Sequence, residues 1–324
     1  MRFVHGASAA VVLSLAFLAA AHAEDSGRVG GLLGTIKKAR LIDLSHDWEI
    51  TSPVSAVNPF YSFALSATHA NTRGAFGAFG ENPVGQLSFA AEVQHFSGQH
   101  GAPTIDAIGH IGRDGKLFGG VDAAASTSNP DGIGASGVGA DLGIDKFPSD
   151  LLINRGVLLD VATMVRGDSS PLPADFEITS EHLRHAAEQQ GVKLKKGDTV
   201  FIRTGWAQYF KGGEAVYNGK SSPGPGLDAA NYLIGNGARV VGDDTLTFEK
   251  RPPLAVADGK TQVFPVHMRV IADSGIFIIE NLNLEELAKA KAYEFVVVVP
   301  PLRILGGTGS ALRVLALVPP RDDD

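Results

Sequence analysis

Residues Gln99–His110 read QHGAPTIDAIGH, and we expect the rest of the chain to be organised around this stretch. Two histidines and one aspartate occur within eleven residues, with no lysine or arginine to neutralise the aspartate. Neutral imidazoles and carboxylates are ligands that zinc and manganese accept. Gly101 and Pro103 favour a loop, which can fold His100 and Asp106 around one point. The spacing matches no standard zinc-site pattern, so a polar turn with hydrogen-bonded histidines is the alternative to a metal site.

Composition limits the classes of protein to be considered. The chain has 324 residues, 44% of them hydrophobic, which suffices for one large domain or two small ones. The formal net charge is -7. Because binding to a phosphate backbone requires a basic face, we expect no nucleic-acid partner. The chain has no cysteine, so any bound metal is expected to be held by nitrogen and oxygen.

The N-terminus is typical of an export signal. Arg2 supplies a positive charge, residues 9–20 form a mostly apolar run of twelve, and Ala21–Ala23 is a small-x-small cleavage site. A run of twelve residues is too short to span a bilayer as a mature helix. We therefore expect residues 1–23 to be a signal peptide and the mature chain to be periplasmic or secreted from a bacterium, without a membrane partner. An uncleaved anchor is the alternative.

The pattern of apolar runs predicts an α/β protein with a mixed sheet. We expect residues 24–39 to be a glycine-rich lead-in and residues 40–324 to form a single compact domain. Residues 51–86 and 119–143 are predicted as long loops because glycine, proline and small polar residues dominate them. Elsewhere, predicted strands alternate with predicted helices, which is typical of this fold class. The predicted strands are 40–46, 87–96, 156–161, 199–203, 240–242, 275–280, 295–299 and 312–317, and the predicted helices are 180–190, 227–236 and 284–292.

A second pair of candidate ligands lies far downstream. Glu280 closes a strongly apolar predicted strand, and His267 lies thirteen residues before it. A carboxylate is costly to bury unless it is paired or bound to a metal. Taken alone, the pair is better explained by a salt-bridged glutamate at a strand end and a surface histidine. Beside a histidine–aspartate cluster that lacks enough ligands, the two residues could complete a metal site.

Other polar residues carry weaker signals. His182 and His185 lie three apart in a predicted helix, an arrangement more typical of a solvated face than of a metal site. We expect His46 and His95 to be structural. Residues 243–244 are adjacent aspartates that could bind a cation, cap a loop or serve a carbohydrate hydrolase, but nothing places them across a scissile bond.

At this point the order of motifs resembles the cyclase-like metal-dependent hydrolases, a family that includes bacterial kynurenine formamidase, isatin hydrolase and a dienelactone hydrolase. The signature of the family is H-x-G-T-H-x-D-x-x-x-H, and it stands here at His100–His110. Further family-like stretches follow the order of the family and are Ile42–Ser45, Lys196–Asp198, Arg203–Trp206, Gly242–Thr245, Gly275–Leu282 and Gly309–Ser310.

The resemblance implies both a site and a fold. It implies that His100, Asp106, His267 and Glu280 hold a divalent metal, Mn²⁺ or Zn²⁺, and that His110 is the catalytic histidine that handles the proton. It also implies a compact swivelling β/β/α domain and a homodimer or homotetramer. The implied reaction is the opening of a small cyclic amide, a lactone or a related amide or ester by a metal-activated water.

The sequence departs from the family signature at one ligand position. Ala102-Pro103-Thr104 stands where the family has Gly-Thr-His, so a threonine replaces an imidazole. Loss of an imidazole makes the site richer in oxygen and shifts its preference from zinc toward manganese. The alternative function is therefore an exported small-molecule or metal-binding protein with a decayed hydrolase site. Phe76, Phe79 and Trp206 are candidates for the apolar wall of a substrate pocket, although core packing explains each of them equally.

Overall fold

The computed structural model describes residues 28–53, 58–72, 87–99, 101–127, 137–139, 141–212, 214–257 and 260–320. Two compact units are present: Ile42–Ala316 forms one, and Met1–Leu41 with Leu317–Asp324 forms the other. The predicted signal peptide lies outside the described residues. Within the predicted lead-in, residues 28–38 are helical. None of the helices in the described ranges is both long enough and apolar enough to cross a bilayer.

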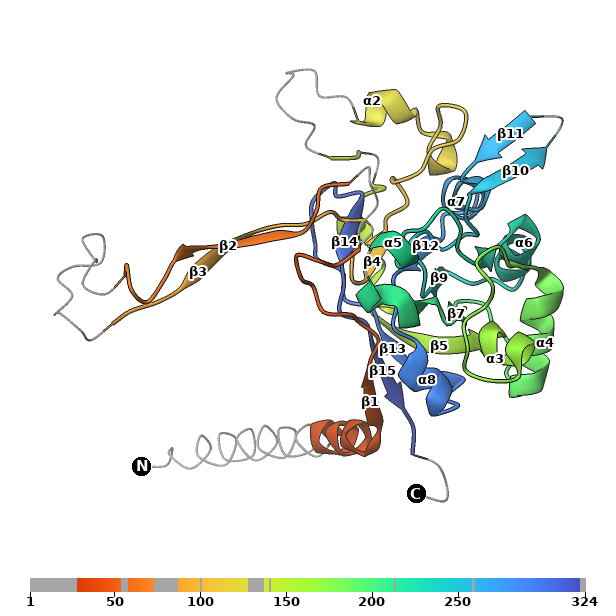
Figure 1. Ribbon diagram of the computed structural model, residues 1–324, viewed down its shortest axis with the longest axis horizontal. Coiled ribbons are helices and arrows are strands. Elements are labelled where there is room, and N and C mark those ends of the chain that lie inside the picture. The colour runs from red at the N-terminus through yellow and green to blue at the C-terminus, as the bar shows by residue number, and fades with distance from the viewer. Residues whose placement is uncertain are drawn as a thin grey trace, which may run out of the picture. The chain divides into compact units, whose positions relative to one another are not determined.

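A nine-stranded sheet organises the fold, and its central strands run in parallel (Figure 1). In spatial order, its strands are β1 (Arg40–Asp43), β15 (Leu315–Val318), β13 (Glu294–Val298), β5 (Ile153–Asp160), β7 (Thr199–Arg203), β9 (Val240–Asp243), β12 (Phe277–Glu280), β4 (Thr104–Asp106) and β14 (Gly309–Ala311). β5, β7, β9 and β12 are parallel to their neighbours in this run, whereas β13, β4 and β14 pair antiparallel. The predicted α/β class and mixed sheet are confirmed.

Each of the four parallel strands ends in a charged residue. The last residues are Asp160 in β5, Arg203 in β7, Asp243 in β9 and Glu280 in β12, and all four are buried. Because parallel strands end at one edge of a sheet, these side chains are gathered there, where α/β proteins usually bind ligands. The edge formed by these carboxyl ends is therefore where the candidate site is expected.

Helices cover this part of the sheet with their apolar faces. α3 (Val161–Arg166), α4 (Ser180–Gln190) and α6 (Leu227–Gly235) gather beside β5 and β7 in Figure 1. In α4, buried Leu183, Ala186 and Ala187 recur at helical spacing and join a core that contains residues of β5, β7 and β9. The side chain of Thr179, rather than that of Ser180, caps the start of α4, and Gly191 ends it at a φ of 69°.

The stretch Gln99–His110 contains a strand, one place from the edge of the large sheet, that the sequence pattern did not predict. Thr104–Asp106 forms β4, which pairs antiparallel with β12 on one side and with β14 on the other. Three residues are too few for a period to be recognised, and the pairing partners lie about 170–200 residues further along the chain. The loop predicted for the first half of the stretch is observed at residues 101–103, which form a bend.

A two-stranded ribbon corrects the prediction of one long loop over residues 51–86. Ser62–Ala67 forms β2, which pairs antiparallel with β3 (Ala91–His95) inside the predicted strand 87–96. β2 was missed because its exposed apolar residues alternate with small ones and give only a short signal. Phe76 and Phe79 lie outside the described residues.

Shorter elements complete the fold. Predicted strand 312–317 is observed as β15, and helix 284–292 as the shorter α8 (Glu285–Lys289). The remaining elements are α2 (Ala123–Thr127), β6 (Glu177–Ile178), α5 (Glu214–Tyr217), β8 (Gly224–Pro225), β10 (Leu254–Ala257), β11 (Lys260–Val263) and α7 (Pro265–His267).

Candidate metal centre

Pairing of β4 with β12 brings two carboxylates to one face of the sheet. In the register of the two strands, Glu280 lies opposite Thr104, and Ile278 lies opposite Asp106. Residues opposite one another, and residues two apart on one strand, project from the same face. Asp106 and Glu280 therefore point to the same side, although they lie far apart in sequence. Both are 1% exposed.

His267, at the end of α7, directs its imidazole between these carboxylates. Its Nε2 lies 3.3 Å from Oε1 of Glu280 and 3.7 Å from Oδ2 of Asp106. One potential ligand atom from each of the three residues lies within 4.8 Å of the others, and all three side chains are buried. We call Asp106, His267 and Glu280 the buried triad.

Glu249 orients His267 from the opposite side of the ring. Its Oε1 lies 2.6 Å from Nδ1 of His267 and accepts the backbone N–H of His267 at 3.0 Å, while Oε2 accepts the N–H of Val266 at 3.2 Å. A carboxylate at Nδ1 keeps the proton there and leaves Nε2 free to bind a metal. Burial opposes the charged form, but Glu249 and Glu280 outweigh it and raise the pKa of metal-free His267 well above its usual value. No motif pointed to Glu249, because it lies eighteen residues before His267 in an irregular segment.

We expect Glu249→Gln to weaken metal binding about 10- to 100-fold, as loss of a carboxylate behind a metal-bound histidine does elsewhere. The amide keeps the shape of the side chain but removes the charge that stabilises the Nδ1 proton. Titration of the chelator-treated protein with Mn²⁺ and Zn²⁺, followed by calorimetry, measures the change. Glu177→Gln, which changes a carboxylate that is paired with Lys250, is the control and should leave the affinity unchanged. Equal affinities for Glu249→Gln and wild type would show that Glu249 has no part in binding.

Thr104 stands at the position where the family signature has a histidine. It is 1% exposed, and its Oγ1 accepts the backbone N–H of Gly101 at 3.3 Å. As the cross-strand neighbour of Glu280, it lies on the face that carries the triad carboxylates. Its hydroxyl can offer a neutral oxygen donor or hold a water. His100 lies outside the described residues.

His110 lies at the margin of the buried triad. It follows β4 in a turn closed by its backbone N–H, which donates to the carbonyl of Ala107 at 3.0 Å. Its Nε2 lies 3.9 Å from Oδ1 of Asp106, and its side chain is 25% exposed. Of the sequence-predicted site residues, the structure thus brings Asp106, His110, His267 and Glu280 together.

The donor set of the buried triad fits a divalent metal. Two carboxylates and one imidazole converge below the surface, and a third carboxylate, Glu249, lies directly behind the imidazole. Buried charges in proteins are paired or bound to metals, because desolvation of an unpaired charge is costly. Carboxylate oxygens and an imidazole nitrogen are ligand types that manganese and zinc accept, so a dication suits this donor set. A set with more oxygen than nitrogen suits manganese as well as zinc.

An aromatic cluster packs behind the loop that leads into β4. It contains Trp206, Phe210, Tyr217, Leu246 and Ala102. The Nε1–H of Trp206 donates to the carbonyl of Tyr217 at 3.2 Å, and the Tyr217 hydroxyl lies 2.9 Å from Oδ1 of Asn281, the residue after Glu280. Trp206 is only 6% exposed, so its position is that of a core residue that supports the site rather than of an open pocket wall.

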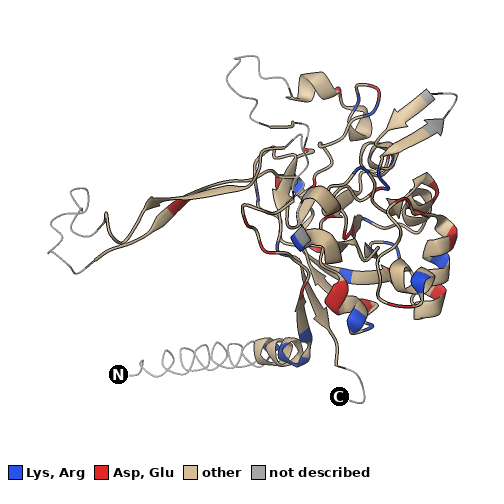
Figure 2. Ribbon diagram, in the orientation of Figure 1, with Lys and Arg blue, Asp and Glu red and all other residues tan. Residues whose placement is uncertain are grey.

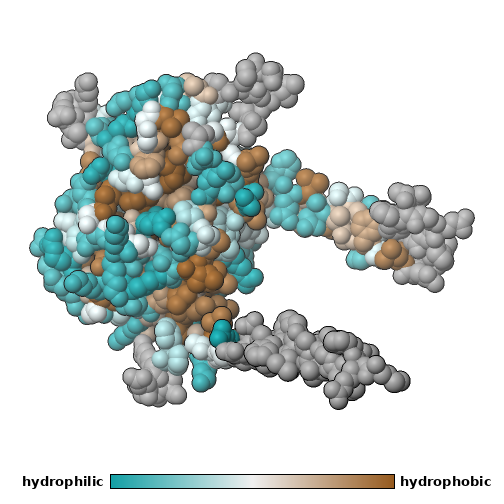
Figure 3. All heavy atoms as spheres, turned by 180° about the vertical axis from the view of Figure 1, so that it is seen from behind, coloured by the Kyte–Doolittle hydropathy of each residue, from teal (hydrophilic) through white to brown (hydrophobic). Residues whose placement is uncertain are grey.

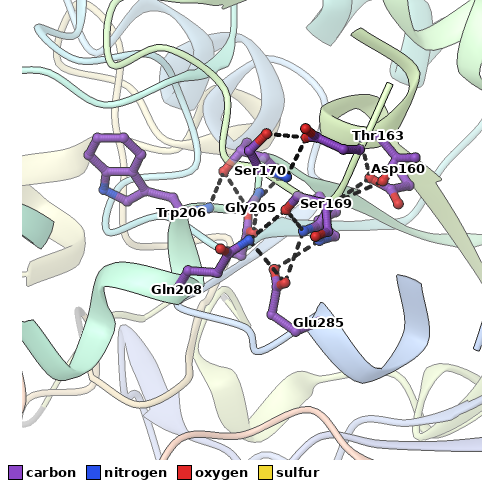
Figure 4. Close-up of polar contacts among 12 residues, drawn as sticks. Asp160, Thr163, Ser169, Ser170, Gly205, Trp206, Gln208 and Glu285 are labelled. Carbon is purple, nitrogen blue, oxygen red and sulfur yellow. Dashed lines mark hydrogen bonds and ion pairs between the residues drawn. The ribbon is translucent and has the colours of Figure 1, made fainter. Parts of the chain in front are cut away.

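A buried arginine network fixes the neighbouring strand ends. Arg203 donates from Nε and Nη2 to both oxygens of Glu285 at 2.8 and 2.9 Å, and from Nη1 to Asp160 at 2.9 Å. Figure 4 shows Asp160, Ser169 and Glu285 close together within this network of polar contacts. The fork of a guanidinium suits such two-pronged pairing, so the charges at the ends of β5 and β7 are used for structure.

The adjacent aspartates at the end of β9 are also structural. Asp244 accepts the backbone N–H groups of Thr204 and Gly205, each at 2.8 Å, and the Thr204 hydroxyl at 2.6 Å. Asp243 accepts the backbone N–H of Thr245 at 2.9 Å. The bonds of Asp244 anchor the segment that carries Trp206, and the bond of Asp243 holds its own turn.

The remaining histidines have separate local roles. His182 completes a capping box with Thr179, His185 is exposed near Glu181, and His95 ends the exposed ribbon strand β3. His46 stacks on Phe210 with ring centroids 3.8 Å apart. Burial lowers the pKa of His46 to about 4, against a hydrogen bond to the Leu282 backbone that raises it.

We expect the buried, neutral His46 to make the protein sensitive to mild acid. Its folded pKa lies below the unfolded value, so its contribution to stability is complete above about pH 6.5 and is lost as the pH falls toward 4. Between pH 7 and pH 5 this group should lower the free energy of unfolding by about 2 kcal/mol. Urea unfolding of wild type and His46→Phe at both pH values isolates the contribution, because the phenylalanine keeps the stacking. The same pH dependence in both proteins would contradict this assignment.

Comparison with known proteins places this geometry in a family. Residues 42–250 match the family model described as "Putative cyclase". The chain is 30% identical over 185 residues to an isatin hydrolase of Roseibium aggregatum, and this match covers 54% of the chain but less than two thirds, 65%, of the relative. A solved structure described as a novel cyclase is 27% identical to this chain, and the two superpose with a TM-score of 0.72. The match covers 88% of this chain and 89% of the solved chain. An isatin hydrolase bound to the product analogue thioisatinate shares the fold at 21% identity with a TM-score of 0.66, covering 93% and 99%.

The family match and the site overlap along the chain. The matched residues include Asp106, His110 and Glu249, and the likeness to the solved cyclase covers 88% of the chain. The match covers more than half of the sequence. On this evidence the chain belongs to the cyclase family.

Proposed function

We propose that this protein is a metal-dependent hydrolase that opens a small cyclic amide, a lactone or a related amide or ester. The observation that carries the proposal is the buried triad of Asp106, His267 and Glu280, with Glu249 behind the histidine. The likeness to an isatin hydrolase at 30% identity supports a hydrolytic reaction. The N-terminal pattern further supports export with cleavage after Ala23, which N-terminal sequencing of the mature protein checks.

The residues of the triad would hold the metal, and His110 would move the proton. A divalent metal bound there would supply a polarised carbonyl and a water of lowered pKa. His110 is partly exposed and lies 3.9 Å from Asp106, so it can reach both the buried carboxylates and an incoming substrate. In the proposed reaction, His110 accepts a proton from the attacking water and returns it to the leaving nitrogen or oxygen. Water adds to the carbonyl carbon, and the bond from that carbon to the leaving atom breaks.

Metal content and hydrolysis of a small panel test this proposal together. The mature protein is purified without chelator or a metal-binding tag, analysed for metal, and assayed with lactams, lactones and arylformamides. We expect about one or two equivalents of manganese or zinc per chain, and hydrolysis that chelator abolishes and added metal restores. A protein that binds neither ion and turns over none of these compounds would refute the hydrolase.

A decayed site is the second candidate function, and Thr104 is the observation that favours it. This buried threonine faces the triad where a histidine would add an imidazole ligand. A binding protein that kept the fold would then need no turnover. If Thr104→His creates hydrolysis that wild type lacks, the decayed site is favoured. Hydrolysis by wild type at a rate that Thr104→His does not improve excludes it.

We also propose that the protein is a homodimer or homotetramer held together by the β2–β3 ribbon. Phe63 and Leu65 on one face and Val93 on the other are each at least 50% exposed. Figure 2 shows little charge along the ribbon, and Figure 3 shows apolar side chains on its surface. An isolated two-stranded ribbon is marginally stable in water, so a partner is needed to cover it. The low charge suits a second copy of the same ribbon.

Light scattering after gel filtration checks the oligomer. Phe63→Ser combined with Leu65→Ser should shift the protein toward monomer, because the two side chains share one face of the ribbon. Leu305→Ser, at a residue that is 80% exposed, is the matched control and should not change the mass. A wild-type monomer at micromolar concentration would contradict the proposal.

A further inference from the structure

Arg251 is a cation near the site that the reaction described above does not use. Its side chain is half-buried, and its Nη1 is buried with no hydrogen-bond partner among the described residues. Nor does it form an ion pair within the part of the chain that the structure describes, unlike Arg155 and Arg203, whose carboxylate partners are 2.6–2.9 Å away. Leaving a buried guanidinium unpaired is costly, so a group that pairs with it on binding would contribute strongly to affinity.

Ser222 lies beside Arg251 and has an unused hydroxyl as well. The two residues form an isolated antiparallel bridge, in which the backbone N–H of Arg251 donates to the carbonyl of Ser222 at 2.9 Å. Ser222 is 0% exposed, and its Oγ has no partner among the described residues. Side chains of directly opposed antiparallel residues project from the same side, about 5 Å apart at Cβ. A hydroxyl and a guanidinium N–H are therefore offered on one side of the bridge.

The bridge lies next to the buried triad. Arg251 follows Glu249, the carboxylate that holds His267, by two residues. The charge of Arg251 also interacts with that of Glu280: burial lowers the pKa of the guanidinium, and Glu280 opposes this change. A molecule with one end at the triad can therefore have its other end near Arg251.

We propose that Arg251 and Ser222 form a subsite for a carboxylate that the substrate carries in addition to the bond to be hydrolysed. A carboxylate accepts from both a guanidinium and a hydroxyl, and it neutralises the otherwise unpaired cation. The substrate class is thus an anionic amide, lactone or ester rather than a neutral one. This specificity rests on the proposed function, because the scissile bond is taken to lie at the triad.

A set of arylformamides tests the subsite by turnover. Formanilide is compared with 2-, 3- and 4-formamidobenzoate, which differ from it only by a carboxylate; water cleaves each to formate and an aniline. We expect wild type to prefer at least one formamidobenzoate, and Arg251→Met to lower kcat/KM for that compound about 10- to 100-fold while leaving formanilide unchanged. Arg251→Lys should restore part of the loss, and Ser222→Ala should cause a smaller loss of the same kind.

Lys250→Met is the matched control, because it removes a charge from the adjacent residue. Lys250 faces Glu177 at 3.6 Å and lines a pocket of about 280 Å³, which Glu249 also lines but none of the triad residues does. This variant should retain the preference of wild type for the carboxylate. Thermal unfolding of each variant establishes that the protein is folded before the kinetics are compared.

A binding measurement separates failure of the subsite from failure of the hydrolase. Calorimetry with benzoate and benzamide should show tighter binding of benzoate to wild type and loss of this difference in Arg251→Met, with or without metal. If wild type hydrolyses the formamidobenzoates no faster than formanilide, and Arg251→Met hydrolyses each compound as fast as wild type, the subsite is refuted and the hydrolase stands. If wild type binds neither metal and hydrolyses none of the lactams, lactones and arylformamides, but the benzoate preference depends on Arg251, the subsite stands and the hydrolase is refuted. Equal binding of benzoate to both proteins refutes the subsite.

Discussion

Asp106→Asn is expected to lose metal binding and hydrolysis together. The amide has the shape of the carboxylate, so the pairing of β4 with β12 and β14 should persist, but one of the two negative ligands of the triad is gone. We expect metal affinity to fall at least about 100-fold, since removing a group behind a ligand already costs 10- to 100-fold. Activity should fall at least about 1000-fold, because the metal is expected to supply both the polarised carbonyl and the nucleophile.

Three measurements on the same preparations check this result. Metal content and kcat/KM report the loss directly, and the thermal midpoint reports whether added Mn²⁺ or Zn²⁺ stabilises the folded chain. Added metal should raise the midpoint of wild type but not that of Asp106→Asn. Asp243→Asn is the matched control, because it makes the same change at a buried aspartate that is bonded to Thr245 and is not part of the triad. If Asp106→Asn keeps its metal, the triad is not the metal site.

His110→Ala is expected to retain metal and lose turnover. The imidazole lies at the margin of the triad, 3.9 Å from Asp106, which suits a group that exchanges protons with a substrate. Loss of a positioned general base or acid typically costs about 10²- to 10⁴-fold in rate, so we expect kcat to fall within that range. Metal content and the thermal midpoint with metal should match those of wild type.

Comparison with Asp106→Asn separates loss of proton transfer from loss of metal. Both variants should be inactive, but only one should be metal-free, because the two residues have different tasks. His185→Ala removes a histidine that is exposed on α4 and should change neither property. Undiminished turnover in His110→Ala would assign the proton transfer to another group.

Local pattern sufficed for the longer strands and for α4, α6 and α8 in the second half of the chain, but it missed several short elements. These are α3, β6, α5, β8, β10, β11, α7 and β14. Strands β5, β7, β9 and β12 were predicted because each is a short apolar run bounded by turn residues, and α4 was predicted by its periodicity and by Gly191. Such signals are contained within a few residues. β2 and β4 were missed, because β2 is exposed on a ribbon and β4 has only three residues, whose partners lie far along the chain.

Some residues of the candidate site were likewise predictable from the sequence, and others were not. Asp106, His110, His267 and Glu280 could be named from residue type, spacing and family resemblance. The sequence carried no comparable signal for Glu249, or for Ser222 and Arg251, because nothing in their immediate surroundings distinguishes them from surface residues. Only packing shows that Glu249 lies behind His267 and that the bridge of Ser222 and Arg251 lies near Glu280.

The sequence by itself therefore determined the α/β class, the order of most strands of the nine-stranded sheet, and the types of residue available to bind a metal. The tertiary structure decided which of these residues meet. Hydrophobic periodicity acts over one turn or one strand, and it determines which segments become helix or sheet. Sheet register acts between segments more than a hundred residues apart, and a shift of one residue would turn Asp106 away from Glu280. The chemistry of the site depends on that register, which no local stretch of the chain encodes alone.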